Sequence, residues 1–180
     1  MAVETIPISL GFKAPDFSLL DTQSGEVKTL EELSSEKVTV VMFICNHCPY
    51  VIHVNEALIE LAKDYQPKGV SFIAISSNDV ENYPDDSPEK MKEMNYPFPY
   101  LYDESQQTAK DYSAVCTPDF SIFNSEMNCV YRGQLDGSRP GSDVLVSGED
   151  LRAALDNILT GEPVAEIQHP SMGCSIKWKS

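Results

Sequence analysis

Two cysteines three residues apart, Cys45 and Cys48, are the residues whose types and spacing most directly indicate chemistry. They follow an apolar, β-branched run at residues 38–44, which predicts a strand buried on both faces. A helix is predicted directly after them, because apolar residues recur at spacings of three and four from Val51 to Tyr65. The pair therefore stands where a buried strand meets the start of a helix.

This placement predicts a reactive dithiol. Residues three apart at a helical turn lie on one side, so their Cα atoms can come within the roughly 4.4–6.8 Å that a disulfide requires. The helix N-terminus carries partial positive charge and free N–H groups, which stabilise a thiolate and lower its pKa. We expect Cys45 to be the more exposed sulfur and to attack, and Cys48 to resolve the mixed disulfide.

His47 lies between the two cysteines. A protonated imidazole there would favour the thiolate further and make the disulfide more oxidising; the alternative is a solvated side chain without that role. A Cys-x-x-Cys pair can also be half of a zinc site, here with Cys116 or Cys174, but zinc needs further ligands and the chain has no second close pair. We predict redox chemistry with no bound metal or cofactor, and keep a metal-binding module as an alternative.

The elements predicted around the motif alternate between strand and helix. After the first helix we expect strands at 70–75 and 99–102, helices at 88–95, 105–112 and 149–159, and a hairpin at 120–123 and 129–134. This order predicts an α/β fold with parallel central strands, to which the hairpin adds antiparallel edge strands. We expect a single domain, residues 1–180, with residues 162–180 a tail packed on it.

The composition narrows the classes of partner. A formal net charge of −15 disfavours nucleic acids and anionic membrane surfaces, which need clustered Lys and Arg. No apolar stretch approaches the roughly 20 residues that span a bilayer. Residues 1–5 lack the basic and apolar regions of a secretory signal, and five cysteines, an odd number, cannot all pair internally. We expect a cytoplasmic protein with neither nucleic-acid nor membrane partners.

These motifs together resemble the thioredoxin superfamily: a strand ending in Cys-x-x-Cys, an amphipathic helix, and a later Thr117-Pro118 before a hairpin. The segment GFKAPDFSL, residues 11–19, is similar to the opening of the redoxin branch, which includes peroxiredoxins and alkyl hydroperoxide reductases. Two further segments, FICNHCPYV at 43–51 and GCSIKW at 173–178, resemble a subgroup described as peroxiredoxin-like thioredoxin proteins.

The resemblance implies a thioredoxin-like three-layer sandwich, with a central mixed sheet and helices on both faces. Pro118 matches the family's cis-proline, which packs beside the active-site disulfide, and Thr117 would offer backbone groups to a bound thiol partner. Cys116 would then lie near the pair. Cys116 is a candidate redox thiol or a shielding side chain, and Cys174, from the tail, is a candidate resolving thiol or lid element at the active site; the alternative for both is simple packing.

The function that this implies is a thiol-disulfide oxidoreductase with an antioxidant role. Its partners would be protein or small-molecule thiols and disulfides, with another thiol system as electron donor. The alternative is a thiol peroxidase with Cys48 as the peroxidatic thiol. However, the peroxiredoxin pattern P-x-x-x-T-x-x-C, aligned on Cys48, has Val41 and Cys45 at the Pro and Thr positions, and no arginine lies between residues 116 and 123. Dithiol exchange needs none of these donors, so we favour it.

Overall fold

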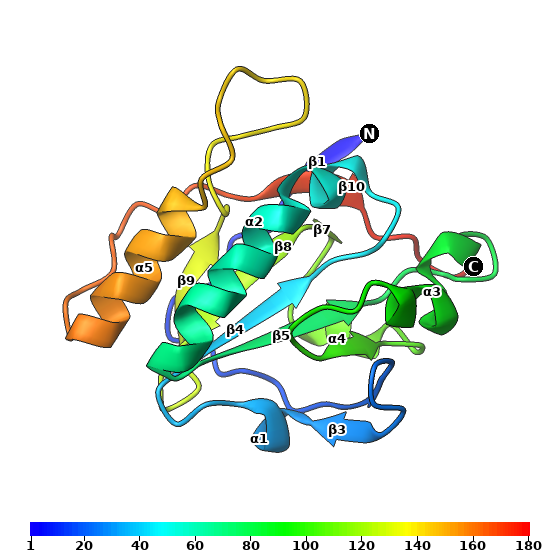
Figure 1. Ribbon diagram of the computed structural model, residues 1–180, viewed down its shortest axis with the longest axis horizontal. Coiled ribbons are helices and arrows are strands. Elements are labelled where there is room, and N and C mark those ends of the chain that lie inside the picture. Colours follow the sequence, from blue (N-terminus) through cyan, green and yellow to red (C-terminus); the bar gives the residue numbers. More distant parts are fainter.

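A seven-stranded mixed sheet forms the centre of the protein in the computed structural model, which describes residues 1–180 (Figure 1). Its strands follow the order β3-β2-β6-β5-β4-β8-β9. Their bounds are β2 Ser18–Asp21, β3 Val27–Thr29, β4 Val38–Phe43, β5 Val70–Ser76, β6 Tyr100–Tyr102, β8 Asp119–Phe123 and β9 Cys129–Gly133.

The predicted parallel centre is confirmed, because β4 pairs with β5 and β5 with β6 in parallel. The hairpin of β8 and β9 is antiparallel as predicted, but only β9 is an edge strand, since β8 lies beside β4. At the other edge, β2 and β3 form a second antiparallel hairpin.

Helices cover both faces of this sheet, which confirms the predicted thioredoxin-like architecture (Figure 1). The α-helices are α1 Leu30–Leu33, α2 Pro49–Tyr65, α3 Pro88–Glu93, α4 Gln107–Asp111 and α5 Glu149–Thr160, with short 3₁₀ turns at η1 Gln66–Lys68 and η2 Pro84–Asp86. Buried residues of α2, α3 and α5 belong to one hydrophobic cluster, and those of α1 and α4 to a second.

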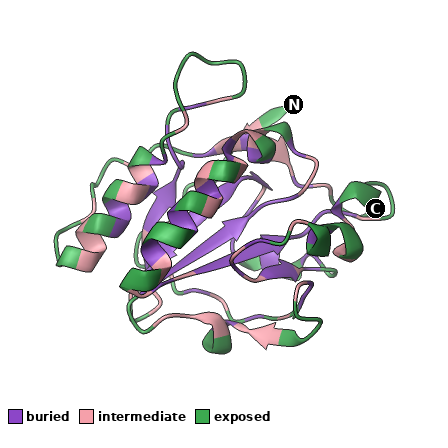
Figure 2. Cartoon of the chain, in the orientation of Figure 1, coloured by how far each residue is buried: buried purple, intermediate pink, exposed green.

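Alternation along β4 explains why the sheet has two buried faces. Val40 and Met42 belong to the cluster beneath α2, whereas Val41 and Phe43 belong to the opposite one. Buried residues accordingly follow the central strands and the inner sides of α2 and α5 (Figure 2). A strand buried on both faces is a rigid support for the residues that follow it.

Helix α2 begins where its sequence favours a helix start. Pro49 occupies the first turn, where a missing N–H costs little, and Cys48 is the N-cap residue. The carbonyl oxygen of Cys48 accepts the backbone N–H groups of Val51 and Ile52, each at 3.0 Å. The chain leaves the helix through η1 to Gly69, whose φ of 91° suits glycine.

A second, three-stranded sheet pairs one strand from near each end of the chain with a short strand from the segment that carries the cis-proline. It has the order β1-β10-β7, with β1 Ala2–Glu4, β7 Cys116–Thr117 and β10 Met172–Ser175, and both pairings are antiparallel. The segment after α5 therefore lies on the domain through β10. None of the helices combines the length and apolar composition that crossing a membrane requires.

Candidate active site

Cys45 and Cys48 lie in the turn that connects β4 to α2. The pairing of β4 with β5 continues to Ile44, whose N–H donates to the carbonyl oxygen of Ile75 at 3.0 Å. All five cysteines of the chain are free thiols. Each of the two thiols shifts the pKa of the other, so Cys45 and Cys48 act as neighbours at the start of α2.

Thr117 is the common neighbour of both sulfurs. The Sγ of Cys45 lies 3.5 Å from the Oγ1 of Thr117, and the Sγ of Cys48 lies 3.3 Å from its carbonyl oxygen. The peptide bond from Thr117 to Pro118 is cis. The structure thus brings together four residues singled out in the sequence from segments about 70 positions apart.

The predicted exposure of Cys45 is wrong. Cys45 is only 1% exposed and Cys48 0%, so neither sulfur is open to solvent. A small cavity lined by Tyr50, Pro118 and Met172 among others has about 20 Å³ of free space, enough for roughly one water, and neither cysteine lines it. The strand β10 packs over the pair, which places Cys174 at the site as the lid hypothesis for the tail expects.

Cys174 is the third thiol at this site. It stands opposite Thr117 in the antiparallel pairing of β10 with β7. It packs against the hydrophobic cluster that contains Cys45 and Cys48, and its side chain and backbone lower the pKa of Cys48. Cys174 is half-buried, whereas Cys48 is fully covered.

The side chain of Cys116 makes no hydrogen bond to Cys45 or Cys48. Its Sγ lies 3.8 Å from the hydroxyl of Thr5, and it is fully buried. Burial, together with the negative charge of Asp119, raises the pKa of its thiol, which disfavours the reactive thiolate. Of the two additional cysteines considered in the sequence, only Cys174 contacts the dithiol.

Cys45 and Cys48 titrate as a pair. The hydrogen bond between them lowers the pKa of Cys48 and raises that of Cys45, because one sulfur keeps the proton that stabilises the charge on the other. Donors from Cys174 lower the pKa of Cys48 further, while burial and the charge of Asp86 raise that of Cys45. The two sulfurs therefore share one proton and ionise as a pair.

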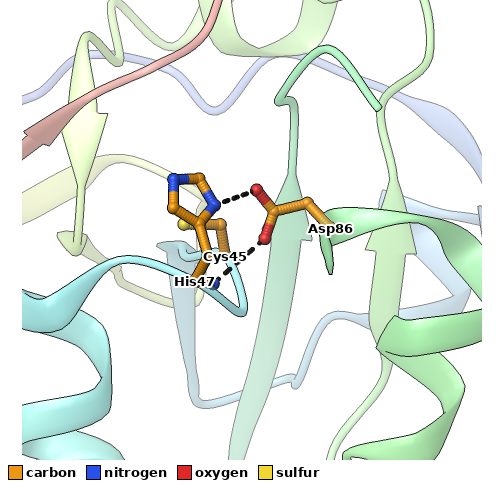
Figure 3. A group of neighbouring side chains, drawn as sticks. All are labelled: Cys45, His47 and Asp86. Atoms are coloured by element: carbon orange, nitrogen blue, oxygen red, sulfur yellow. Dashed lines mark hydrogen bonds and ion pairs between the residues drawn. The ribbon is translucent and has the colours of Figure 1, made fainter. Parts of the chain in front are cut away.

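Asp86, which the sequence analysis missed, holds the turn that carries the dithiol. Its fully buried carboxylate comes from η2 and accepts the backbone N–H groups of Asn46, at 2.7 Å, and His47, at 3.2 Å. The ring Nδ1 of His47 and the side-chain amide of Asn78 bind its other oxygen. Figure 3 shows the carboxylate facing the His47 ring, with Cys45 beside them.

His47 is thus a partner of Asp86 rather than a free solvated side chain. Its ring also stacks on Tyr83, with centroids 5.4 Å apart. Only the chain fold could reveal these partners, because Asp86 lies about 40 residues further along in an acidic, proline-containing loop without a recognisable motif.

The residues whose ligand atoms gather closely enough to hold a metal ion differ from the predicted set of Cys45 and Cys48 with Cys116 or Cys174. Ligand atoms of Cys45, His47 and Asp86 all lie within 4.8 Å of one another. However, four N–H donors already bind the two oxygens of Asp86. A metal ion would have to displace them, so this carboxylate fits the role of a structural anchor better than that of a ligand.

Arg132 is the buried arginine next to the cis-proline segment. It lies on β9, and its guanidinium donates to Asp119 at 3.1 Å, to Ser121 at 3.1 Å and to two backbone carbonyl oxygens. These donors are engaged within the protein, so the arrangement does not offer them to a peroxide oxygen.

Comparisons with known proteins agree with this geometry. An uncharacterised conserved protein from Geobacillus kaustophilus has 59% identity and a TM-score of 0.97, over 99% of this chain and 97% of that one. A hypothetical protein from Sinorhizobium meliloti has 43% identity and a TM-score of 0.95, over 98% of each chain.

More distant structures share the fold. The thioredoxin domain of a thiol-disulfide oxidoreductase from Bacteroides vulgatus has 18% identity and a TM-score of 0.59, over 70% of this chain and 89% of that one. No sequence among curated proteins matches the chain. The model of the AhpC/TSA family matches residues 10–132. The chain therefore belongs to the AhpC/TSA family, within the redoxin branch of the thioredoxin superfamily.

Proposed function

We propose that this chain is a thiol-disulfide oxidoreductase in which Cys45 and Cys48 pass between a dithiol and a disulfide. The observation that carries the proposal is the convergence of both sulfurs on Thr117, beside Pro118 and at the N-terminus of α2. The helix N-terminus stabilises negative charge on sulfur, and the hydrogen bond between the thiols keeps them close enough to pair. Membership of the AhpC/TSA family supports thiol-based oxidoreductase chemistry in general.

The contacts of Cys48 explain how Cys45 could still attack first. The donors from Cys174 that favour charge on Cys48 come from β10 and are lost when that strand moves away. Cys48 then keeps the Thr117 carbonyl oxygen as an acceptor for its own proton, while the Thr117 hydroxyl remains beside Cys45. Displacement of β10 therefore removes groups that favour charge on Cys48 and leaves the Thr117 contacts, which favour the proton on Cys48 and the charge on Cys45.

In the proposed reaction, Cys45 attacks a partner disulfide and Cys48 then attacks Cys45, which releases the reduced partner. Thr117 and Pro118 would position the partner's extended segment, and His47 would tune Cys45 through its contact with Asp86. Another thiol system would return the protein to the dithiol state. A reducing compartment such as the cytoplasm would keep all five thiols free, and removal of disulfides there would serve an antioxidant role.

Reduction of a disulfide substrate tests the proposal directly. Cys45→Ser and Cys48→Ser should each lower the rate of insulin reduction, with a dithiol as electron donor, by about 100-fold or more, because one member of a cooperating pair is missing. Cys129→Ser is the matched control, since Cys129 is a buried cysteine of the opposite cluster and should leave the rate unchanged. Full activity of Cys45→Ser would refute the proposal.

A further inference from the structure

The strand β10 is fitted closely onto the segment that carries the cis-proline. A Cβ atom on Gly173 would stand 1.7 Å from the carbonyl oxygen of Thr117, so only glycine permits this approach. The hydroxyl of Ser171 adds a hydrogen bond of 2.6 Å to the carbonyl oxygen of Pro118. These contacts fix the register of β10 and set Cys174 opposite Thr117.

That register makes Cys48 the middle member of a row of three thiols. The sulfurs of Cys45 and Cys48 both lie against Thr117, at 3.5 Å from its hydroxyl and 3.3 Å from its carbonyl oxygen, and Cys174 stands opposite Thr117 on β10. Cys174 packs against the hydrophobic cluster that contains both other cysteines, yet it remains half-buried and is the most accessible of the three. A disulfide between Cys45 and Cys48 would be covered by β10, whereas one that includes Cys174 would border solvent.

We propose that Cys174 is a third redox thiol, which takes the disulfide over from Cys45 by bonding to Cys48. This inference rests on the proposed exchange at Cys45 and Cys48. The Cys174 thiolate attacks the Cys48 sulfur, the Cys48–Cys174 bond forms, and the Cys45–Cys48 bond breaks. Its electron pair leaves on Cys45, which takes up the proton that Cys174 has lost. The step needs no additional oxidant, because one disulfide replaces another.

The surroundings of Cys174 suit an attacking thiol. Burial raises its pKa in the reduced protein, and the charge on Cys48 raises it further. That second cause disappears once Cys48 is part of a disulfide. The positive charge of Lys177 acts in the opposite direction and lowers the pKa of Cys174. Formation of the Cys45–Cys48 disulfide therefore makes Cys174 easier to ionise. The attack of Cys174 on Cys48 is thus favoured only after that disulfide has formed.

Disulfide mapping of the full-length protein tests the relay. The reduced protein is mixed with glutathione disulfide, quenched in acid with N-ethylmaleimide at successive times, and digested for mass spectrometry. We expect Cys174 to appear linked to the peptide that contains Cys45 and Cys48, and this species to be absent in Cys174→Ser. Because Cys45 and Cys48 share one tryptic peptide, Cys45→Ser assigns the bridge, and it should still link Cys48 to Cys174.

The outcomes separate the relay from the function on which it rests. A Cys45–Cys48 bridge with Cys174 fully alkylated at every time would overturn the relay alone. A bridge from Cys174 to Cys45, detected in Cys48→Ser, would also overturn it. Absence of any bridge in the wild-type protein would overturn the proposed function and the relay together.

A glycine substitution gives a second, independent test that leaves every cysteine in place. Gly173→Ala forces β10 away from Thr117, so we expect the bridge to Cys174 to be lost while the Cys45–Cys48 bridge still forms. Gly137→Ala is the matched control, because a Cβ there meets no atom within 4 Å. An undiminished Cys48–Cys174 bridge in Gly173→Ala would contradict the role that the register of β10 has in the relay.

Discussion

At the scale of single residues, the site depends on where one proton lies. Cys45 and Cys48 are both covered, and the hydrogen bond between them allows one sulfur to carry charge only while the other keeps its proton. The groups that decide the position of this proton lie on other elements: Asp86 beside Cys45, and Cys174 beside Cys48. The reactivity of the pair is therefore set by residues outside the Cys-x-x-Cys motif.

The shared proton predicts a difference between two substitutions of Cys45. Cys48 has a pKa below that of a free thiol, so its thiolate should persist as the pH falls, until the pH passes below that lowered value. Cys45→Ala removes the donor and should shift the thiolate absorbance at 240 nm to higher pH. Cys45→Ser keeps a hydroxyl donor and should shift it less. Equal titration curves for the two variants would contradict a hydrogen bond from residue 45.

At the scale of elements, the turn between β4 and α2 is held from η2. A single buried carboxylate, Asp86, accepts two backbone N–H groups of the turn, the ring N–H of His47 and the side-chain amide of Asn78. Such a carboxylate fixes the geometry of the dithiol, because the turn cannot move without leaving buried donors unpaired.

Removal of that carboxylate should destabilise the protein. Asp86→Ala leaves buried N–H donors without partners, so we expect the free energy of unfolding to fall by about 3 kcal/mol in a denaturant titration. Asp85→Ala, at the exposed neighbouring position, should change it by no more than about 0.5 kcal/mol. Similar stabilities for the two variants would show that the turn does not depend on Asp86.

The sequence predicts those elements whose pattern is local. The strands β4 and β5 are apolar and β-branched, and α2 has a clear apolar face, so both their type and their order follow from the residues. The strands β1, β2 and β10 are only three or four residues long and largely exposed or half-buried. The pairings of β1 with β10, β10 with β7 and β2 with β6 join residues more than 50 positions apart, which a local pattern does not contain.

The same distinction applies to the site. The Cys45 and Cys48 pair is visible because its spacing matches a helical turn, and Thr117-Pro118 because the resemblance marks it. Asp86 has no such spacing. The burial of the pair was also beyond the sequence, because it results from β10, whose register depends on the fit of Gly173 against Thr117.

At the scale of the whole molecule, the excess of acidic residues should lower the free energy of unfolding through repulsion between like charges. The chain has 28 Asp and Glu residues against 13 Lys and Arg. Like charges on a compact surface repel each other, and salt screens that repulsion as the Debye length falls from about 30 Å at 0.01 M to about 8 Å at 0.15 M.

Screening predicts that salt stabilises the protein near neutral pH. The melting temperature at pH 7 should rise between about 0.01 M and 0.15 M sodium chloride, since repulsion weakens over that range. At pH 4.4, the isoelectric point calculated for the chain, net charge is close to zero and the same addition should have little effect. A melting temperature that falls with salt at pH 7 would show that attractive ion pairs outweigh the repulsion.

The sheet of β1, β10 and β7 ties the two ends of the polypeptide to the place where sulfur chemistry is proposed. Residues 2–4 support β10 from outside, and β10 in turn shields the thiols. An affinity tag, a fusion partner or a protease acting at either end is therefore not a neutral alteration. Such a change can alter the pairing of β1 with β10 and so the cover over the thiols. The rate at which the thiols react in tagged or clipped protein would then depend on how stably β1 and β10 remain paired.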